Sequence, residues 1–508
     1  MTFQSGLIIK NLNLESIVIL LLLIVVSLIS LEMLGRKNII QHGTARNALH
    51  IIAGSAASIA PLIYDDIITL TVISFLLAIL TFFLVKNSIL KSIDPRHLKS
   101  WGIFYFPLSY LVLLLVWGNS AWIISFSILI LSFGYSLAAF FGSRFSKNYF
   151  ILSRDKKSFI GSLIFFIVTF LVLFFWGVGL ESLFGIKSNV TINADVYYLF
   201  AASILIAAIL TVIEALSSSG LDNLLIPLFS AVLLSILFEN PNKELLINFI
   251  QGMLLAAFVA VVSYRVKFLT ASGAAATFLL AGFIFGLGGW KWSVPILLFF
   301  ILSSLLSKLR LKVNLKVESY FNKSGVRDYL QVAANGGLGG LLVILNVFDD
   351  NPIYYIIYLA SLAAVCSDTW ATEIGTLKET DTYNILNFKK IEQGMSGGIS
   401  LIGTLGGMVG GSIIALSGYF WFDNNLLISL ILITSAGIAG SLFDSFLGAK
   451  FQIQYKCGEC DRITEKKNHC NKESLRFRGL GWLDNDMVNL FAGIFGGIFA
   501  IVVSGIIL

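Results

Sequence analysis

The chain has 508 residues, of which 57% are hydrophobic and only 13% are charged, and its formal net charge is +6. Soluble domains of this size do not have such a composition, which is typical of polytopic α-helical membrane proteins. Apolar runs of about twenty residues, in place of alternating segments of about ten, also exclude a transmembrane β-barrel. We therefore predict an all-α, polytopic membrane protein.

Sixteen apolar segments are long enough to be membrane spans. The first has no small-residue cleavage site, so we expect it to be retained as a span and not removed as a signal peptide. The predicted spans cover approximately residues 16–34, 48–63, 66–85, 101–117, 121–142, 159–180, 197–216, 223–238, 245–263, 268–289, 292–307, 329–347, 353–367, 396–420, 424–449 and 487–507.

The loops between these spans alternate in charge. Only Lys10, Lys187, Lys243 and Lys291 fall on one side of the predicted membrane, and the other 31 of the 35 Lys and Arg residues fall on the opposite side. Because Lys and Arg mark the cytoplasmic side, we expect a multi-pass protein of the cell membrane with both termini outside. The positive charge suits anionic headgroups and phosphates, and no nucleic-acid partner is expected.

The polar segment 239–244 leaves eight predicted spans on each side of it. The two halves share landmarks at matching places. The fifth spans end in 134–142 and 367–375, the seventh carry Glu214 and Asp444, and the eighth begin at Asp222 and Asp484. Since each half has an even number of spans, these landmarks predict two parallel eight-helix repeats, with domains at residues 1–243 and 244–508.

Two acids follow an apolar run in the segment 366–375. Burying an unpaired carboxylate in hydrocarbon costs several kcal/mol, so acids at such positions usually face a partner, a cavity or an ion. On a helix, Asp368, Thr372 and Gly375 share one face. An acidic helix end that is merely solvated at the membrane surface is the simpler alternative.

Further candidates for chemistry fall on the same predicted cytoplasmic side as these acids. Carboxylate and amide oxygens are ligands that Mg²⁺ prefers, a glycine-rich turn at a helix start can bind an anion, and Arg and Lys neutralise phosphate charge. The set therefore predicts a magnesium–nucleotide site, although for Gly403, Gly407 and Gly411 we favour helix packing. The members of the set besides Asp368 and Thr372 are Arg327, Asn335, Glu373, Gly394, Ser396, Gly397, Gly398, Asp444, Lys450, Asp484 and Asn485.

Three of the four cysteines lie in a polar insertion at residues 451–482. Cys457 and Cys460 form a Cys-x-x-Cys pair, and His469 and Cys470 follow as neighbours. Thiolate and imidazole groups are the ligands of structural zinc, so we expect a small zinc-stapled hairpin. Ordinary reduced cysteines are the alternative, because one Cys-x-x-Cys falls short of the usual zinc pattern.

The second half carries a family resemblance. Residues 261–490 resemble the integral membrane family related to transmembrane protein 19, which includes the plant phytyl-phosphate kinase. The resemblance rests on residues 273–289, 331–336, 368–375, 394–400, 444–449 and 483–485. It implies a CTP-dependent kinase that converts an isoprenoid monophosphate, of phytyl, geranylgeranyl or polyprenyl type, to the diphosphate. On this reading Asp368, Asp444 and Asp484 are the catalytic carboxylates.

The first half resembles, more loosely, the phytol and dolichol kinase family, through residues 46–50, 157–162, Glu214 and 220–224. Such kinases have an Asp after the glycine where this chain has Gly134-Tyr135, and a phenol does not replace a carboxylate at neutral pH. Phosphorylating an alcohol needs a general base, whereas a monophosphate is already an anion. We therefore assign the kinase to the second half. A bifunctional alcohol and monophosphate kinase, or a lipid or anion transporter, are the alternatives.

Overall fold

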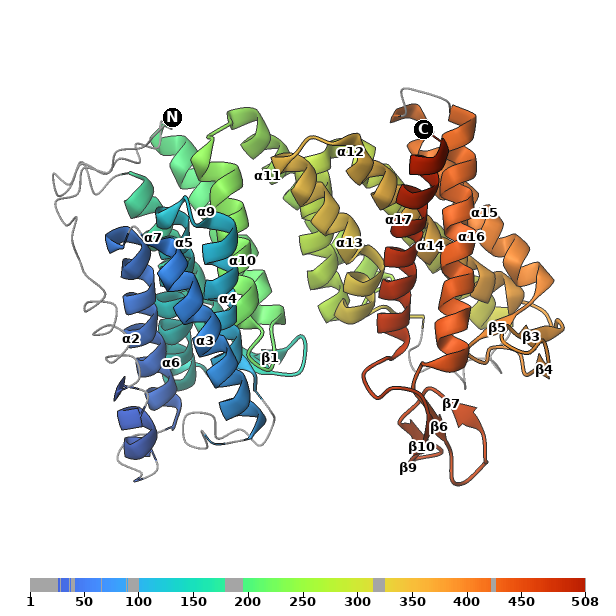
Figure 1. Cartoon of the computed structure of the whole chain (residues 1–508), viewed down its shortest axis with the longest axis horizontal. Coiled ribbons are helices and arrows are strands. Elements are labelled where there is room, and N and C mark those ends of the chain that lie inside the picture. Colours follow the sequence, from blue (N-terminus) through green and yellow to red (C-terminus); the bar gives the residue numbers. More distant parts are fainter. Residues whose placement is uncertain are drawn as a thin grey trace. The chain divides into compact units, whose positions relative to one another are not determined.

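A computed structural model describes residues 26–27, 29–35, 37, 42–64, 66–87, 89, 100–178, 195–313, 325–421 and 426–507. The chain forms two compact units, Met1–Leu246 and Ile247–Leu508. Figure 1 draws the first unit in blue to green and the second in green to red.

The predicted helical membrane fold is confirmed. In the described part of the chain, twelve helices are long and apolar enough to cross a membrane, and α4 (Gly102–Trp117) is a shorter apolar helix. The predicted span 16–34 lies partly outside the described residues, which begin at residue 26. The count of sixteen spans and the parallel duplication therefore stay predictions.

The first unit is built around α5 (Ala121–Leu129), which is apolar on every side and largely buried. A π-helical turn, η1 (Ile130–Tyr135), follows it and contains Gly134-Tyr135. Such turns are frequent at functional sites. The other elements of this unit are α2 (His42–Ile63), α3 (Ile67–Lys86), α6 (Ser136–Phe145), β1 (Tyr149–Ile151), β2 (Lys156–Ser158), α7 (Phe159–Gly177), α9 (Val196–Leu216), α10 (Asp222–Leu234) and η2 (Ser235–Glu239).

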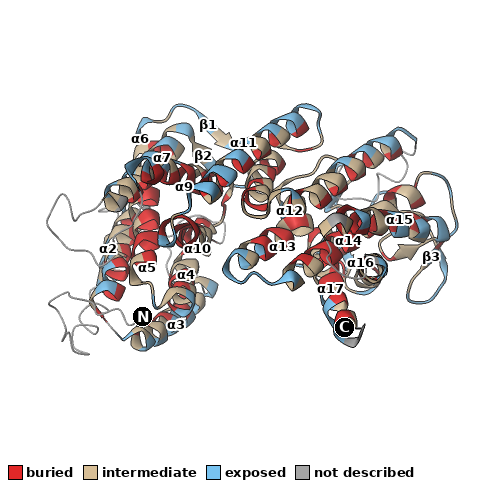
Figure 2. Cartoon of the chain, turned by 90° about the horizontal axis from the view of Figure 1, so that it is seen from above, coloured by how far each residue is buried: buried red, intermediate tan, exposed pale blue. Residues whose placement is uncertain are grey.

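In the second unit, α14 (Pro352–Gly375) is the central helix. It packs against α12 (Ala271–Val313), α13 (Tyr329–Phe348), α15 (Leu401–Gly418), α16 (Leu426–Lys450) and α17 (Asn485–Ile507). Residues 359–367 of α14 are buried on all sides, and Figure 2 shows buried residues, in red, along this helix. The unit also contains α11 (Lys243–Arg265), which begins just before the unit boundary, and η4 (Tyr419–Trp421).

Small residues let α15 approach α14 closely. A Cβ atom added to Gly407 would lie 2.8 Å from the carbonyl oxygen of Ser367, and one added to Gly403 would lie 2.9 Å from the carbonyl oxygen of Ala371. Both distances are shorter than a carbon–oxygen contact allows, so these positions accept only glycine at this helix spacing. The predicted packing role of this glycine stripe is confirmed.

The predicted spans 268–289 and 292–307 are the two arms of α12, which is broken at Gly289 (φ 61°, ψ −155°). The second arm does not end at residue 307, as predicted, but continues to Val313. The prediction was wrong there because Lys308 and Arg310 were assigned to a basic loop. Arg310 is instead buried in the helix, where Glu373 pairs with its charge.

Two groups of short antiparallel strands lie at the same end of the helices in the second unit (Figure 1). In the first group, β3 (Thr382–Asn384) pairs with β4 (Lys390–Ile391) and β5 (Gly398–Ile399). In the insertion, β6 (Gln454–Lys456) pairs with β7 (Ile463–Thr464) and β10 (Leu475–Arg478), and β8 (Asn468–His469) pairs with β9 (Lys472–Glu473). These loop structures surround the ends of α14 and α16 and the start of α17.

Candidate functional site

A polar cavity of about 240 Å³ lies at this end of the second unit. It is formed by the last turns of α14 and α16, the first turn of α17 and the segment 393–400, which we name the glycine loop. Lys450 is not among the lining residues, and its ammonium lies 5.1 Å from the ring centroid of Phe451. The predicted residues that do line the cavity are Arg327, Asn335, Asp368, Thr372, Glu373, Gly394, Ser396, Gly397, Gly398, Asp444, Asp484 and Asn485.

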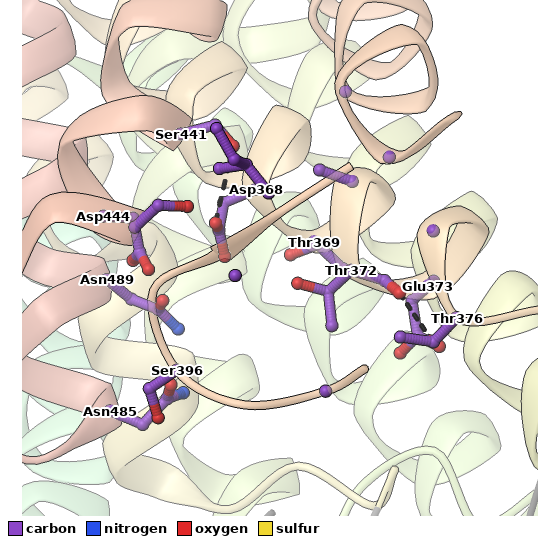
Figure 3. Close-up of a pocket in the computed structure, with 18 of the residues that line it drawn as sticks. Asp368, Thr369, Thr372, Glu373, Thr376, Ser396, Ser441, Asp444, Asn485 and Asn489 are labelled. Atoms are coloured by element: carbon purple, nitrogen blue, oxygen red, sulfur yellow. Dashed lines mark hydrogen bonds between the residues drawn. The ribbon is translucent and has the colours of Figure 1, made fainter. Parts of the chain in front are cut away.

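Asp368 and Asp444 are the central acids of the cavity. Figure 3 shows their carboxylates extending toward the same space from α14 and α16. Ser441 Oγ donates a hydrogen bond of 3.5 Å to Asp368 Oδ1. Asp444 Oδ2 is buried and has no hydrogen-bond partner among the described residues. Leaving a buried carboxylate oxygen unsatisfied is costly, so this atom points to a ligand or cation as its partner.

The start of α17 supplies a second polar group. Asp484 is exposed, and its Oδ1 accepts a hydrogen bond of 3.1 Å from the backbone nitrogen of Met487, which caps the helix. Asp486, which is buried, also lines the cavity, as does Asn489. Asn489 Nδ2 donates a hydrogen bond of 3.3 Å to Asn335 Oδ1. The sequence analysis did not select Asn489, although its position four residues after Asn485 on a helix could have indicated it.

The glycine loop holds its shape through two left-handed residues, Gly394 (φ 88°) and Gly397 (φ 83°). A Cβ atom added to Gly397 would also lie 2.4 Å from Ala449 Cβ, so this position excludes side chains for two reasons. The loop ends at Ser400, whose Oγ accepts a hydrogen bond of 3.1 Å from the nitrogen of Gly403 and caps α15. The loop backbone therefore meets the positive end of a helix, which favours an anion.

Arg327 supplies positive charge to the cavity. Its Nη1 donates a hydrogen bond of 3.0 Å to Ser304 Oγ. Burial lowers the pKa of Arg327 to about 10, against the opposing effect of Glu373, so the guanidinium stays protonated at neutral pH. Glu373 is already occupied, because its Oε2 accepts from Arg310 Nε at 2.5 Å and its Oε1 accepts from Ser307 Oγ at 2.5 Å.

The donor set suits magnesium bound together with a nucleotide. Mg²⁺ is usually held by one or two carboxylates plus phosphate oxygens, and not by a complete protein cage. In the described residues, the acids of the cavity do not form a cluster of three or more ligands that could hold a metal by themselves. Asp368 and Asp444, whose Oδ2 is unsatisfied, could supply the one or two carboxylates that such a magnesium ion takes from the protein.

The predicted zinc ligands are brought together by the fold of the insertion. The ligand atoms of Cys457, Cys460, His469 and Cys470 all lie within 4.8 Å of one another. We name these four residues the Cys/His cluster. Cys366, by contrast, is buried in α14 among apolar residues.

In the first unit, the predicted landmarks Glu214 and Asp222 both lie next to a lysine. Lys157 Nζ lies 2.6 Å from Glu214 Oε1 and 3.5 Å from Asp222 Oδ2. Arg46 Nη2 donates a hydrogen bond of 2.5 Å to the hydroxyl of Tyr135. Burial alone would lower the pKa of Lys157, but the charges of Glu214 and Asp222 outweigh it and raise that pKa above its ordinary value. A single lysine of the chain therefore pairs with both acids, while Glu214 Oε2 has no hydrogen-bond partner among the described residues.

The matches with known proteins each cover about half of this chain. The family model described as "Integral membrane protein DUF92" matches residues 254–497. An uncharacterized membrane protein of Methanocaldococcus jannaschii is 31% identical over 266 residues, which are 52% of this chain and 98% of the relative. No solved structure matches the chain.

Two relatives come from Arabidopsis thaliana. Protein PGR is 27% identical over 264 residues, which are 47% of this chain and 90% of the relative. Protein VTE6, chloroplastic, is 26% identical over 245 residues, which are 47% of this chain and 66% of the relative. The resemblance of the first half to alcohol kinases lies outside the residues matched by the family model and stays a prediction. The chain belongs to the DUF92 family of integral membrane proteins.

Proposed function

We propose that the second unit is a CTP- and magnesium-dependent kinase that converts an isoprenoid monophosphate to the diphosphate. The observation that carries this proposal is the pair of Asp368 and Asp444, with Asp444 Oδ2 buried and unsatisfied, in a polar cavity that ends at the glycine loop. The resemblance to the family that includes phytyl-phosphate kinase supplies the donor and the substrate class.

Different residues of the cavity would bind the different parts of the two phosphorylated molecules. Asp368 and Asp444 would hold magnesium, which when bound neutralises phosphate oxygens and helps to align them. The glycine loop would bind phosphate through its backbone amides and the start of α15. Arg327, which is cationic at neutral pH, would reduce the repulsion between donor and acceptor phosphates.

Phosphoryl transfer from CTP to a monophosphate depends on the positions of the two phosphate groups more than on the removal of a proton. An oxygen of the isoprenoid monophosphate attacks the γ-phosphorus of CTP, the bond from that phosphorus to the β–γ bridging oxygen breaks, and CDP leaves with that oxygen. Because the attacking oxygen is already anionic, no general base is required. The engagement of Glu373 by Arg310 and Ser307 is compatible with such a site, since this carboxylate is not needed as a base.

An apolar cavity of about 430 Å³ offers a place for the isoprenoid chain. It is lined by side chains of α16, α17 and the segment before α17, among them Phe443, Leu447, Leu483 and Phe495. Phe443 precedes Asp444 and Leu483 precedes Asp484 in the chain, so the apolar cavity adjoins the helix ends that carry the acids. A lipid could therefore enter from the membrane while its phosphate meets the polar cavity, on the side we propose to be cytoplasmic.

The test uses the purified full-length protein with γ-labelled CTP, Mg²⁺ and a panel of prenols and prenyl monophosphates. We expect label in prenyl diphosphate, no label from prenols, and loss of the product in Asp444→Asn. Label transferred to prenols would favour the bifunctional alternative. Absence of any transfer, together with movement of prenyl phosphates across proteoliposomes, would replace the kinase by a transporter.

A further inference from the structure

The insertion at residues 451–482 has too little apolar packing to fold by itself. Its strands are two to four residues long, and short isolated hairpins are marginal in water. Several of its large apolar side chains are exposed: Leu475 is 74% exposed, Phe477 52% and Trp482 59%. Domains of this size usually need a disulfide or a metal in place of a core.

The Cys/His cluster has the spacing of a tetrahedral zinc shell. Zinc–sulfur bonds of about 2.3 Å place neighbouring sulfurs of a tetrahedron about 3.8 Å apart. Cys470 Sγ lies 3.9 Å from Cys460 Sγ. His469 Nδ1 lies 3.5 Å from Cys460 Sγ and 3.3 Å from Cys470 Sγ. Cys457 completes the set within the 4.8 Å that encloses all four ligand atoms.

Residues with left-handed backbone angles lie at or next to the ligands of the Cys/His cluster. Cys470 (φ 51°) and Asn471 (φ 59°) are both left-handed and form the two-residue turn between β8 and β9, as a type I′ hairpin turn requires. Asn is common in such a turn, but Cys is not, so the conformation costs free energy that a ligand would offset. Asp461 (φ 56°), directly after Cys460, is left-handed as well.

A backbone hydrogen bond closes the turn between β6 and β7, which carries two of the four proposed ligands. The nitrogen of Cys457 donates a hydrogen bond of 2.9 Å to the carbonyl oxygen of Arg462.

One residue connects the insertion to the polar cavity. Glu465 directly follows β7, and its Oε1 accepts hydrogen bonds of 2.8 Å from Ser396 Oγ in the glycine loop and of 2.8 Å from Gln452 Nε2. Gln452 is buried just before β6. The turn that carries Cys457 and Cys460 joins β6 to β7, so its geometry fixes where Glu465 lies.

We propose that the Cys/His cluster binds one structural zinc ion and that the zinc-bound insertion holds Glu465 against the glycine loop. Four protein ligands close the zinc shell, so the ion has no open position for catalysis. Glu465, which itself lines the polar cavity, is then a positioning residue that holds the glycine loop through Ser396. The inference concerns the metal and the order of the loop, and it stands whether or not the cavity is a kinase site.

The test measures zinc content and backbone hydrogen exchange in the purified full-length protein under reducing conditions. We expect about one zinc per chain, retained in Cys366→Ala, the matched control outside the cluster, and lost in Cys457→Ser. Removing zinc from the wild type with a chelator should accelerate exchange in both the insertion and residues 394–398 by about tenfold or more, and added Zn²⁺ should reverse it. The chelated wild type keeps the test decisive if Cys457→Ser fails to fold.

Glu465→Ala separates positioning from folding. We expect this variant to keep its zinc and a protected insertion while residues 394–398 exchange faster, with Glu465→Gln closer to the wild type. The metal site would be overturned by protein that contains no zinc but still shows slow hydrogen exchange in the insertion. A disulfide within the cluster in place of zinc would overturn it as well. Zinc removal that loosens only the insertion would overturn the link to the glycine loop.

Discussion

Lys157 Nζ lies 2.6 Å from Glu214 Oε1 in the first unit. Asp222 is the second acid on this lysine, at 3.5 Å. Among the described residues, neither Asp368 nor Asp444 of the second unit takes part in such an ion pair. An internal cation and an external one compete for the same carboxylates, so the Lys157 pairing disfavours a bound metal at Glu214 and Asp222. We propose that Asp368 and Asp444, which lack such a pairing, bind one.

Removing the Lys157 charge should destabilise the first unit. Its side chain is 13% exposed, and those of Glu214 and Asp222 are 8% and 5% exposed. Lys157→Met would leave two buried acids without their cation, at a cost of about 3–5 kcal/mol. Lys156→Met is the matched control: Lys156 is exposed and lies 4.3 Å from the Tyr149 ring centroid, and its loss should cost about 1 kcal/mol or less. Thermal and denaturant unfolding in detergent would measure both.

The same ion pair predicts a pH dependence. The folded-state pKa of Lys157 is raised above its ordinary value, so its stabilising contribution is fully present below the unfolded pKa of about 10.4 and is lost as pH rises through the folded pKa. The stability difference between wild type and Lys157→Met should therefore stay constant from about pH 7 to 10 and shrink only above it. A difference that disappears between pH 7 and 9 would contradict the assigned pairing.

Gly397 should be intolerant of any side chain. An alanine at φ 83° costs about 1–2 kcal/mol in backbone strain, and its Cβ would lie 2.4 Å from Ala449 Cβ. Gly397→Ala should therefore displace the glycine loop and weaken CTP binding by at least about tenfold. Gly337→Ala in α13, where a Cβ meets no atom within 4 Å, should leave binding unchanged. Equal CTP affinity of both variants in calorimetry would show that the loop does not hold the nucleotide.

Apolar length and loop charge predicted the helices well, because a membrane span must satisfy its backbone hydrogen bonds within itself and needs about twenty apolar residues. The acids at helix ends were also predictable, since Asp368 and Asp444 interrupt apolar runs at matching ends of α14 and α16. Both acids lie at the same end of the unit, as the predicted alternation of spans requires, and the packing of α14 against α16 brings them to one cavity.

Other members of the site depend on contacts between distant segments. Arg310 was assigned to a loop because charge usually ends a span, and only its pairing with Glu373 explains why α12 continues past it. Glu465 belongs to an insertion without apolar periodicity, and its bond to Ser396 could not be read from spacing. The sequence alone led us to choose Asp484 over Asp486 as a catalytic acid. In the structure Asp484 is exposed and caps α17, whereas the carboxylic side chain of Asp486 is buried.

The proposed membrane orientation can be tested with single cysteines. Lys147→Cys, Lys390→Cys and Lys472→Cys place thiols at exposed positions in loops we expect to face the cytosol. In intact cells these variants should resist a membrane-impermeant maleimide, and they should react after permeabilisation. Asp350→Cys, which is exposed on the opposite side in the predicted topology, is the matched control and should react from outside. Labelling of two of the first three in intact cells would reverse the orientation.

Substitution of the central acids should abolish the proposed kinase. Asp368→Asn and Asp444→Asn keep the side-chain shape but remove a negative charge that metal–nucleotide binding requires. Each should lower the rate of monophosphate phosphorylation by about two orders of magnitude or more, which corresponds to several kcal/mol of transition-state stabilisation. The measurement is transfer of label from γ-labelled CTP to a prenyl monophosphate, with thermal stability checked for each variant.

The matched control is Asp222→Asn, which removes an acid of the same kind from the first unit. Because Asp222 is paired with Lys157 and not with a metal, this variant should phosphorylate the monophosphate at close to the normal rate once its folding is verified. If Asp222→Asn lowers the phosphorylation rate as much as Asp368→Asn and Asp444→Asn do, the acids act through folding and not through a shared metal. If Asp368→Asn retains activity while Asp222→Asn loses it, the chemistry belongs to the first unit, and the Lys157 pairing must open during the reaction.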